Sequence, residues 1–329
     1  MKNLRTQNSL YPAGRNTRHR IFLFLLAAAS LVSVTAIHAL SGEPAAESPG
    51  PKLIAAARSA GTASFTRQNS DQNYKPTAGE LVVAVVANEL ADREKLRKWI
   101  CMIEKRAGKE TLTEEQVETR DGPLYRLLAI DGAALNPGQR QQDDARIGRL
   151  LKDPSLLLKL KQAEADDELK LQKLLTLMPI AFLYDYDGVE DNLLRLKFRP
   201  NPDYAPPTYE ARVIHSLAGT FLIDSDRKRM TKVVGHLINR VEFGYGLLGR
   251  VDSGTVEFGR VEVGPQQWKT AFIDIHFSGR VAIFKTITKD QYERRSDFRL
   301  VASDLSLSDA NALLVSRVLP LPQSPKIGQ

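Results

Sequence analysis

The chain has 329 residues, with 46 basic and 39 acidic side chains, a length that allows two domains. Five of the basic residues lie within the first 20 positions, so the rest of the chain carries 41 against 39. This near-neutral balance does not indicate nucleic-acid binding, which depends on a basic patch on the folded domain. The single cysteine, Cys101, excludes an internal disulfide bond and is expected as a small apolar residue beside Ile100.

The first 40 residues have the layout of a secretory signal peptide. A basic stretch without acids leads into the apolar run Ile21–Val34, which small residues suited to cleavage follow. That run is shorter than the roughly 20 apolar residues of a membrane-spanning helix. We therefore expect cleavage between Ile37 and Glu43 and a periplasmic or secreted mature protein. An uncleaved signal anchor is the alternative.

Residues 41–76 are rich in Ala, Ser, Pro, Gly, Asn and Gln and offer little that could form a core. We expect them to be a disordered spacer between the export signal and the domain. A single folded domain is expected over residues 77–316, followed by a proline-containing tail over residues 317–329.

The first part of this domain is predicted to combine a helix with strands. A capping box at Thr77–Glu80 precedes the apolar face of a helix that reaches Leu90. Two strands are predicted, Trp99–Lys105 and Tyr125–Ile130, and the stretch between them, Lys109–Asp121, is polar.

A second helical region is predicted from Asn136-Pro137, interrupted by Asp153-Pro154. A long charged helix then covers Ser155–Met178 and is ended by Pro179. Its mixture of Lys with Asp and Glu indicates a solvated face stabilised by pairs four residues apart. A partner-binding coil is the alternative interpretation. A short helix is predicted near the end of the domain, at Leu307–Val315.

The stretch Asn192–Val301 is predicted as a run of antiparallel strands bounded by turn residues. Gly259 is expected to mark a β-bulge. With the preceding helices, this predicts an α+β fold: a curved antiparallel β-sheet, or half-barrel, with helices packed on one side. The expected strands are Leu194–Arg199, Gly219–Asp224, Met230–Ile238, Thr255–Val263, Trp268–Phe277 and Arg280–Thr288.

The sequence contains partial matches to nucleotide-binding and calcium-binding motifs, but the surrounding residues do not fit either function. Gly244–Gly249 matches G-x-G-x-x-G, but it leads into a strand and is expected to shape a hairpin. Asp185–Gly188 is expected to be a solvated acidic turn, because it lacks the spacing of a calcium loop. His215, His236 and His276 belong to no catalytic or metal-binding pattern. We therefore predict no enzyme and no catalytic, metal-binding or cofactor-binding residues.

The predicted strands are also rich in aromatic and aliphatic side chains. A filled core between sheet and helices is the simpler interpretation. The sharper one is that part of this surface lines a cavity for an apolar ligand, as curved sheets and open barrels often do. The candidate lining residues are Phe221, Phe243, Tyr245, Phe258, Trp268, Phe272 and Phe284.

Several stretches resemble a group of uncharacterised exported bacterial proteins, over about Gly79–Leu314. More remotely, the order of a helix, strands, a helical insertion and a strand series is similar to that of periplasmic lipoprotein carriers and outer-membrane lipoprotein-sorting proteins. That resemblance implies a half-barrel closed by helices around an apolar cavity for acyl chains. It carries over no ligand-contacting residue, and the helical insertion Asn136–Met178 departs from it. The stretches that resemble the exported group are Phe198–Pro207, Gly219–Arg229, Val241–Gly254 and Ser296–Arg299.

From these observations we expect a non-enzymatic periplasmic binding protein or carrier for a lipid or a lipoprotein acyl chain. The alternative is a structural or interaction module of the cell envelope, with a filled core and an envelope protein as partner. A hydrolase is a more distant alternative. An apolar cavity of a few hundred cubic ångström would favour the carrier, and a filled core would favour the module.

Overall fold

The computed structural model of the chain describes residues 76–93, 97–245, 247–281 and 285–316. The predicted signal peptide, almost all of the predicted spacer, the tail and Phe284 lie outside the described residues.

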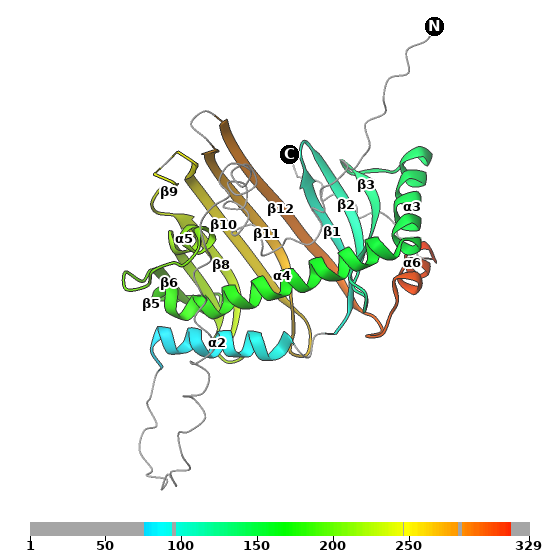
Figure 1. Cartoon of the computed structure of the whole chain (residues 1–329). Helices are drawn as coiled ribbons and strands as arrows, with labels where there is room; N and C mark the ends of the chain where they lie inside the picture. Colours follow the sequence, from blue (N-terminus) through cyan, green and yellow to red (C-terminus); the bar gives the residue numbers. More distant parts are fainter. Residues whose placement is uncertain (1–75, 94–96, 246, 282–284, 317–329) are drawn as a thin grey trace, which may run out of the picture.

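The described strands form one open antiparallel sheet in the order β4-β3-β2-β1-β12-β11-β10-β8-β7-β6-β5, with β9 paired to β10 (Figure 1). The first strand pairs with the last one, so β1 and β12 lie side by side within the sheet. This confirms the α+β fold with a large antiparallel sheet that does not close. The strands are β1 (Trp99–Ala107), β2 (Glu110–Val117), β3 (Leu124–Ile130), β4 (Ala133–Ala134), β5 (Phe182–Glu190), β6 (Leu193–Pro200), β7 (Leu217–Asp224), β8 (Arg229–Leu237), β9 (Val241–Phe243), β10 (Gly249–Gly264), β11 (Gln267–Val281) and β12 (Lys285–Leu300).

Two helices, α2 and α4, lie across one face of the sheet (Figure 1). The predicted capping box starts α2: the backbone N–H of Thr77 donates to Glu80 at 2.8 Å, and the N–H of Glu80 donates to the Thr77 hydroxyl at 3.2 Å. The described helices are α2 (Ala78–Arg93), α3 (Pro137–Lys152), α4 (Pro154–Ala181), α5 (Tyr209–His215) and α6 (Leu307–Ser316).

The main core fills the space between α2, the C-terminal part of α4 and the sheet. Its largest contributions from the sheet are aromatic and β-branched side chains, which pack well on a pleated surface. The apolar cavity left beneath the two helices, beside Val82, Met178 and Phe221, measures only about 10 Å³. This volume does not hold even a short acyl chain, so this part of the core is filled.

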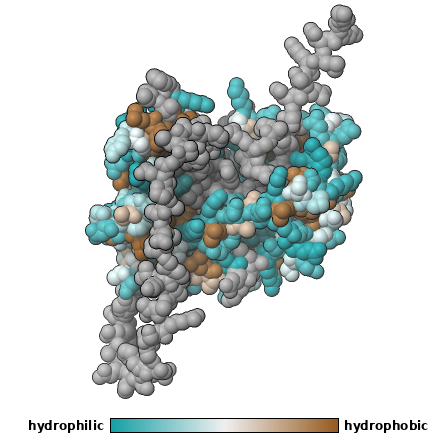
Figure 2. Space-filling view, in the orientation of Figure 1, coloured by the Kyte–Doolittle hydropathy of each residue, from teal (hydrophilic) through white to brown (hydrophobic). Residues whose placement is uncertain are grey.

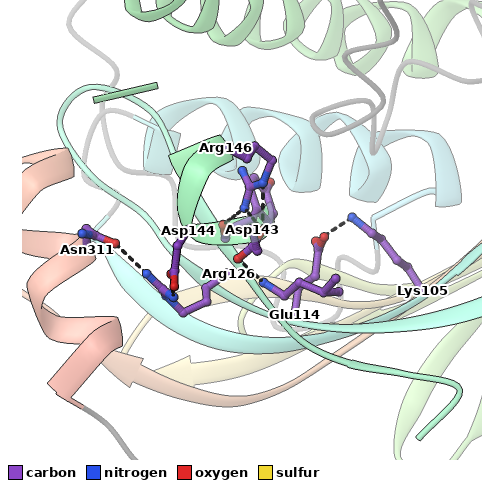
Figure 3. Close-up of polar contacts among 9 residues, drawn as sticks. Lys105, Glu114, Arg126, Asp143, Asp144, Arg146 and Asn311 are labelled. Carbon is purple, nitrogen blue, oxygen red and sulfur yellow. Dashed lines mark hydrogen bonds and ion pairs between the residues drawn. The ribbon is translucent and has the colours of Figure 1, made fainter. Parts of the chain in front are cut away.

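A second core lies on the other face of β1, β2 and β3. Ile100, Val117 and Leu124 pack there with side chains of α3 and α6 and with Leu157 and Leu160 near the start of α4, whereas their neighbours in the strands point to the opposite face. The α3 helix also covers the open edge of β3, where Asp143 accepts the N–H of Leu127 at 3.1 Å (Figure 3). Pairing this edge protects it from association with other strands.

The α4 helix continues three residues beyond its expected end. Pro179 lies inside its last turn, and the helix ends at Ala181. The backbone carbonyls that this last turn leaves free are bound from outside the helix: Asn201 donates to Ile180 and Ala181, at 2.9 and 3.0 Å, and Tyr184 donates to Met178. These bonds satisfy carbonyls that the end of a helix leaves without a donor.

Three predictions about the strands and the stretches between them need correction. The polar stretch Lys109–Asp121 contains β2, whose Glu114 is fully buried and accepts a bond from Lys105 at 2.5 Å (Figure 3). Arg280–Thr288 is not one strand, since it spans the end of β11 and the start of β12. Asp185–Gly188 lies within β5 and is not a turn. The register shift at Gly259 confirms the predicted bulge.

Candidate binding cleft

A large cleft opens between the middle of α4, the C-terminal end of α2 and the face of the sheet that these helices cover. We call it the α4 cleft. Its volume is about 960 Å³, which is at the upper end of the range for small-molecule sites. On the outer surface of the molecule, the area where α4 crosses the sheet is mainly hydrophilic (Figure 2).

Part of the lining of the α4 cleft is apolar, and we call these side chains the apolar end. It is formed by Leu90 of α2, Leu171 and Leu175 of α4, Met230 of β8 and Phe258 of β10. These side chains belong to the main core or pack against it. The apolar end is therefore the exposed margin of a core that is filled elsewhere.

A second part of the lining is polar and comes from the sheet, and we call it the polar end. Lys269 of β11 donates to both carboxylate oxygens of Glu118, at 2.8 and 2.9 Å. Arg295 of β12 donates to Glu293 at 2.5 Å, and this carboxylate contributes to raising the pKa of the guanidinium. Tyr125 of β3 is buried beside them, and its burial raises the pKa of its phenol.

Most charged side chains of the α4 cleft are neutralised by a partner from another element. Glu89 of α2 lies between two guanidinium groups, those of Arg229 and Arg260. Lys161 of α4 contacts Asp121 at 2.9 Å, and its hydrogen bond lowers the pKa of that carboxyl. A ligand would therefore meet paired charges along much of these walls.

Two uncharged buried groups in the α4 cleft have no hydrogen-bond partner among the described residues. They are the side-chain oxygen of Gln116 and the indole Nε1 of Trp268. Leaving such a group unpaired in a protein interior costs about 1–3 kcal/mol. Unpaired buried groups are rare in folded proteins, and each one calls for an explanation such as a bound molecule.

The aromatic residues that we predicted to line one cavity lie in different parts of the structure. Phe258 and Trp268 line the α4 cleft, whereas Phe221 and Phe243 are buried in the main core. Tyr245 is fully exposed at the turn between β9 and β10.

Phe272 lies beside Gly259, which it pairs with across β10 and β11. Because Gly259 follows the inward-facing Phe258, Phe272 lies on the opposite face of the sheet from the α4 cleft. The bulge next to Gly259 shifts the register, so Trp268 and Phe272 do not share a face although an even number of residues separates them.

The remaining candidates for chemistry lie apart from the α4 cleft. His215 is 2.9 Å from the backbone oxygen of Asn201. His236 and His276 line a separate hollow of about 500 Å³, where His276 contacts Asp290. The described residues lining this hollow include no serine, and no group of three or more potential metal ligands is found in the part of the chain that the structure describes.

Cys101 points to the face of the sheet that carries the polar end of the α4 cleft, whereas Ile100 points to the other face. It packs with Ile103 and Tyr125. Burial raises the pKa of its thiol to about 12, so it is protonated at neutral pH and poorly nucleophilic.

No protein-family model, no curated protein and no solved structure matches this chain. Among the described residues, no helix has the length and apolar character to span a membrane.

Proposed function

We propose that the chain is a non-enzymatic binding protein or carrier of the periplasm, and that it holds one lipid or lipoprotein acyl chain in the α4 cleft. The observation that carries this proposal is that the α4 cleft combines a group of apolar side chains with a group of polar ones. An amphipathic molecule matches that combination. The signal-like N-terminus supports the compartment.

The acyl chain would lie against Leu90, Leu171 and Leu175 and enter through the hydrophobic effect, at about 0.8 kcal/mol per buried methylene. Its headgroup would face the ion pairs of the polar end. This placement differs from a cavity deep between sheet and helices, because the space there is only about 10 Å³. The ligand would therefore bind at the margin of the core and keep part of its surface accessible.

A second candidate function is an interaction module of the cell envelope. The filled core beneath α2 and α4 favours it, since a scaffold needs no internal space. Its partner would bind the charged outer surface of α4, which carries a mixture of Lys, Asp and Glu over Lys161–Lys173.

One pair of variants tests the carrier proposal. Leu171→Asp places a carboxylate at the apolar end of the cleft, where an acyl chain would bury it unpaired. Leu169→Asp makes the same change two residues earlier on α4, at a side chain that is 51% exposed and does not line the cleft. We expect Leu171→Asp to abolish binding of a fluorescent fatty acid to delipidated protein, while Leu169→Asp binds like the wild type.

Circular dichroism of both variants controls for folding. If the delipidated wild type binds no acyl probe at micromolar concentration, the carrier proposal is wrong and the interaction module gains. Equal losses in both folded variants would move the binding site to the outer surface of α4.

A further inference from the structure

The polar end of the α4 cleft contains hydrogen-bonding groups that the fold itself does not use. Gln116 is 5% exposed, and its side-chain oxygen is buried without a partner among the described residues. The indole N–H of Trp268 is also buried without a partner among the described residues. Both residues line the α4 cleft. One group accepts hydrogen bonds and the other donates them.

The ion pair of Lys269 with Glu118 connects these two groups. Glu118 follows Gln116 by two residues, and Lys269 is the neighbour of Trp268 in β11. Because this pair spans 2.8–2.9 Å, it brings the end of β2 close to the start of β11. The unpaired acceptor and donor thus belong to the two sides of one polar surface.

Two of the bases of this surface are already paired with carboxylates. Lys269 is bound to Glu118 and Arg295 to Glu293. A phosphate or carboxylate headgroup could pair with either base only by competing with the carboxylate already bound to it. A headgroup of zero net charge avoids this competition and can still use the free acceptor and donor.

We propose that Gln116 and Trp268 form a headgroup subsite of the α4 cleft, and that it selects lipids whose headgroup has no net charge. Gln116 would accept a hydrogen bond from a headgroup hydroxyl or ammonium, and the Trp268 indole would donate one to a headgroup oxygen. This subsite rests on the proposed function, because it presupposes that the acyl chain occupies the apolar end.

The first test compares three lipids with the same single acyl chain, each below its critical micelle concentration. They are a monoacylglycerol, a zwitterionic lysophosphatidylethanolamine and an anionic lysophosphatidylglycerol. Isothermal titration calorimetry with the delipidated full chain should show tighter binding of the first two. Equal or tighter binding of the anionic lipid would overturn the proposed selectivity.

The second test removes the two groups with little change in shape, by Gln116→Leu and Trp268→Phe. Each should weaken binding of lysophosphatidylethanolamine by about three- to tenfold, the effect of one net hydrogen bond. Gln116→Leu should also leave the melting temperature unchanged or higher, because it removes a buried oxygen that has no partner among the described residues. A merely structural glutamine would lower the melting temperature instead.

Gln291→Leu is the matched control, because the side-chain oxygen of Gln291 is also buried without a partner among the described residues but does not line the α4 cleft. It should leave lipid affinity unchanged. If Gln116→Leu and Trp268→Phe bind all three lipids like the wild type, the headgroup subsite is wrong while the carrier proposal stands. If the wild type binds none of the lipids, both are wrong.

Discussion

Arg93, in the last turn of α2, donates two hydrogen bonds to the carboxylate of Glu168 in the middle of α4. The two residues are far apart in the sequence, and their pairing joins the two helices at the rim of the α4 cleft. Gln172 adds a third bond to the same carboxylate, at 2.8 Å. These bonds, led by those from Arg93, hold the pKa of Glu168 below its ordinary value.

This pKa shift predicts a pH-dependent contribution to stability. A carboxyl whose pKa is lower in the folded than in the unfolded state stabilises the fold above its unfolded pKa, and this contribution is lost as the pH falls through the folded pKa. The ordinary value is 4.5, so the loss should begin below about pH 5. Because the pair is partly exposed, its contribution at pH 7 is small, about 0.5–1 kcal/mol.

Arg93→Ala should therefore lower the urea midpoint at pH 7 and should lower it less at pH 3, because the contribution of Glu168 is lost as the pH falls through its folded-state pKa. Lys170→Ala is the control, since it removes a base from α4 that approaches a carboxylate only at 4.0 Å. A midpoint difference that is the same at both pH values would show that Arg93 acts through packing rather than through its charge.

The sequence predicted those strands in which apolar and polar side chains alternate, such as β6, where Leu196 and Phe198 are buried and Lys197 is exposed. It did not predict β2, because two consecutive buried side chains of this strand, Glu114 and Glu115, are acids. Glu114 is buried against Lys105, a residue of the neighbouring strand. Burial of a charge depends on a partner that only the folded sheet brings near, so no local pattern reveals it.

The α4 cleft was not predicted for a similar reason. Its ion pairs join distant parts of the chain, as Arg260 of β10 joins Glu89 of α2. Two of its aromatic residues, Phe258 and Trp268, were among the predicted cavity candidates, but strand alternation alone could not separate them from Phe272. The bulge at Gly259 decides which of these residues face inward, and its effect on the register of β11 depends on pairing with β10.

The attachment of α3 to the edge of β3 predicts unequal effects at two adjacent acids (Figure 3). Asp143 is 2% exposed and accepts bonds from the Leu127 N–H and from Arg146. Asp143→Ala should lower the free energy of unfolding by about 2–4 kcal/mol, because it removes the acceptor of the buried Leu127 amide and the carboxylate that pairs with Arg146.

Asp144→Ala is the matched control. Asp144 is exposed, and its partner Arg126 also donates to Asn311, at 2.8 Å. We expect a loss below about 1 kcal/mol, as for other surface ion pairs. Urea denaturation of both variants measures the difference. Equal losses would mean that the bond between α3 and the β3 edge contributes little.

Two glycines predict opposite responses to the same substitution. A Cβ at Gly219 of β7 would lie 1.9 Å from the backbone oxygen of Val234 in β8, so Gly219→Ala forces the two strands apart. We expect it to destabilise the fold by about 3 kcal/mol or more. A Cβ at Gly148 of α3 would meet nothing within 4 Å, and Gly148→Ala should stabilise the fold by about 0.5–1 kcal/mol through its higher helix propensity. Thermal melts of the two variants give the sign of each effect. A tolerated Gly219→Ala would contradict the close pairing of β7 with β8 that the main core depends on.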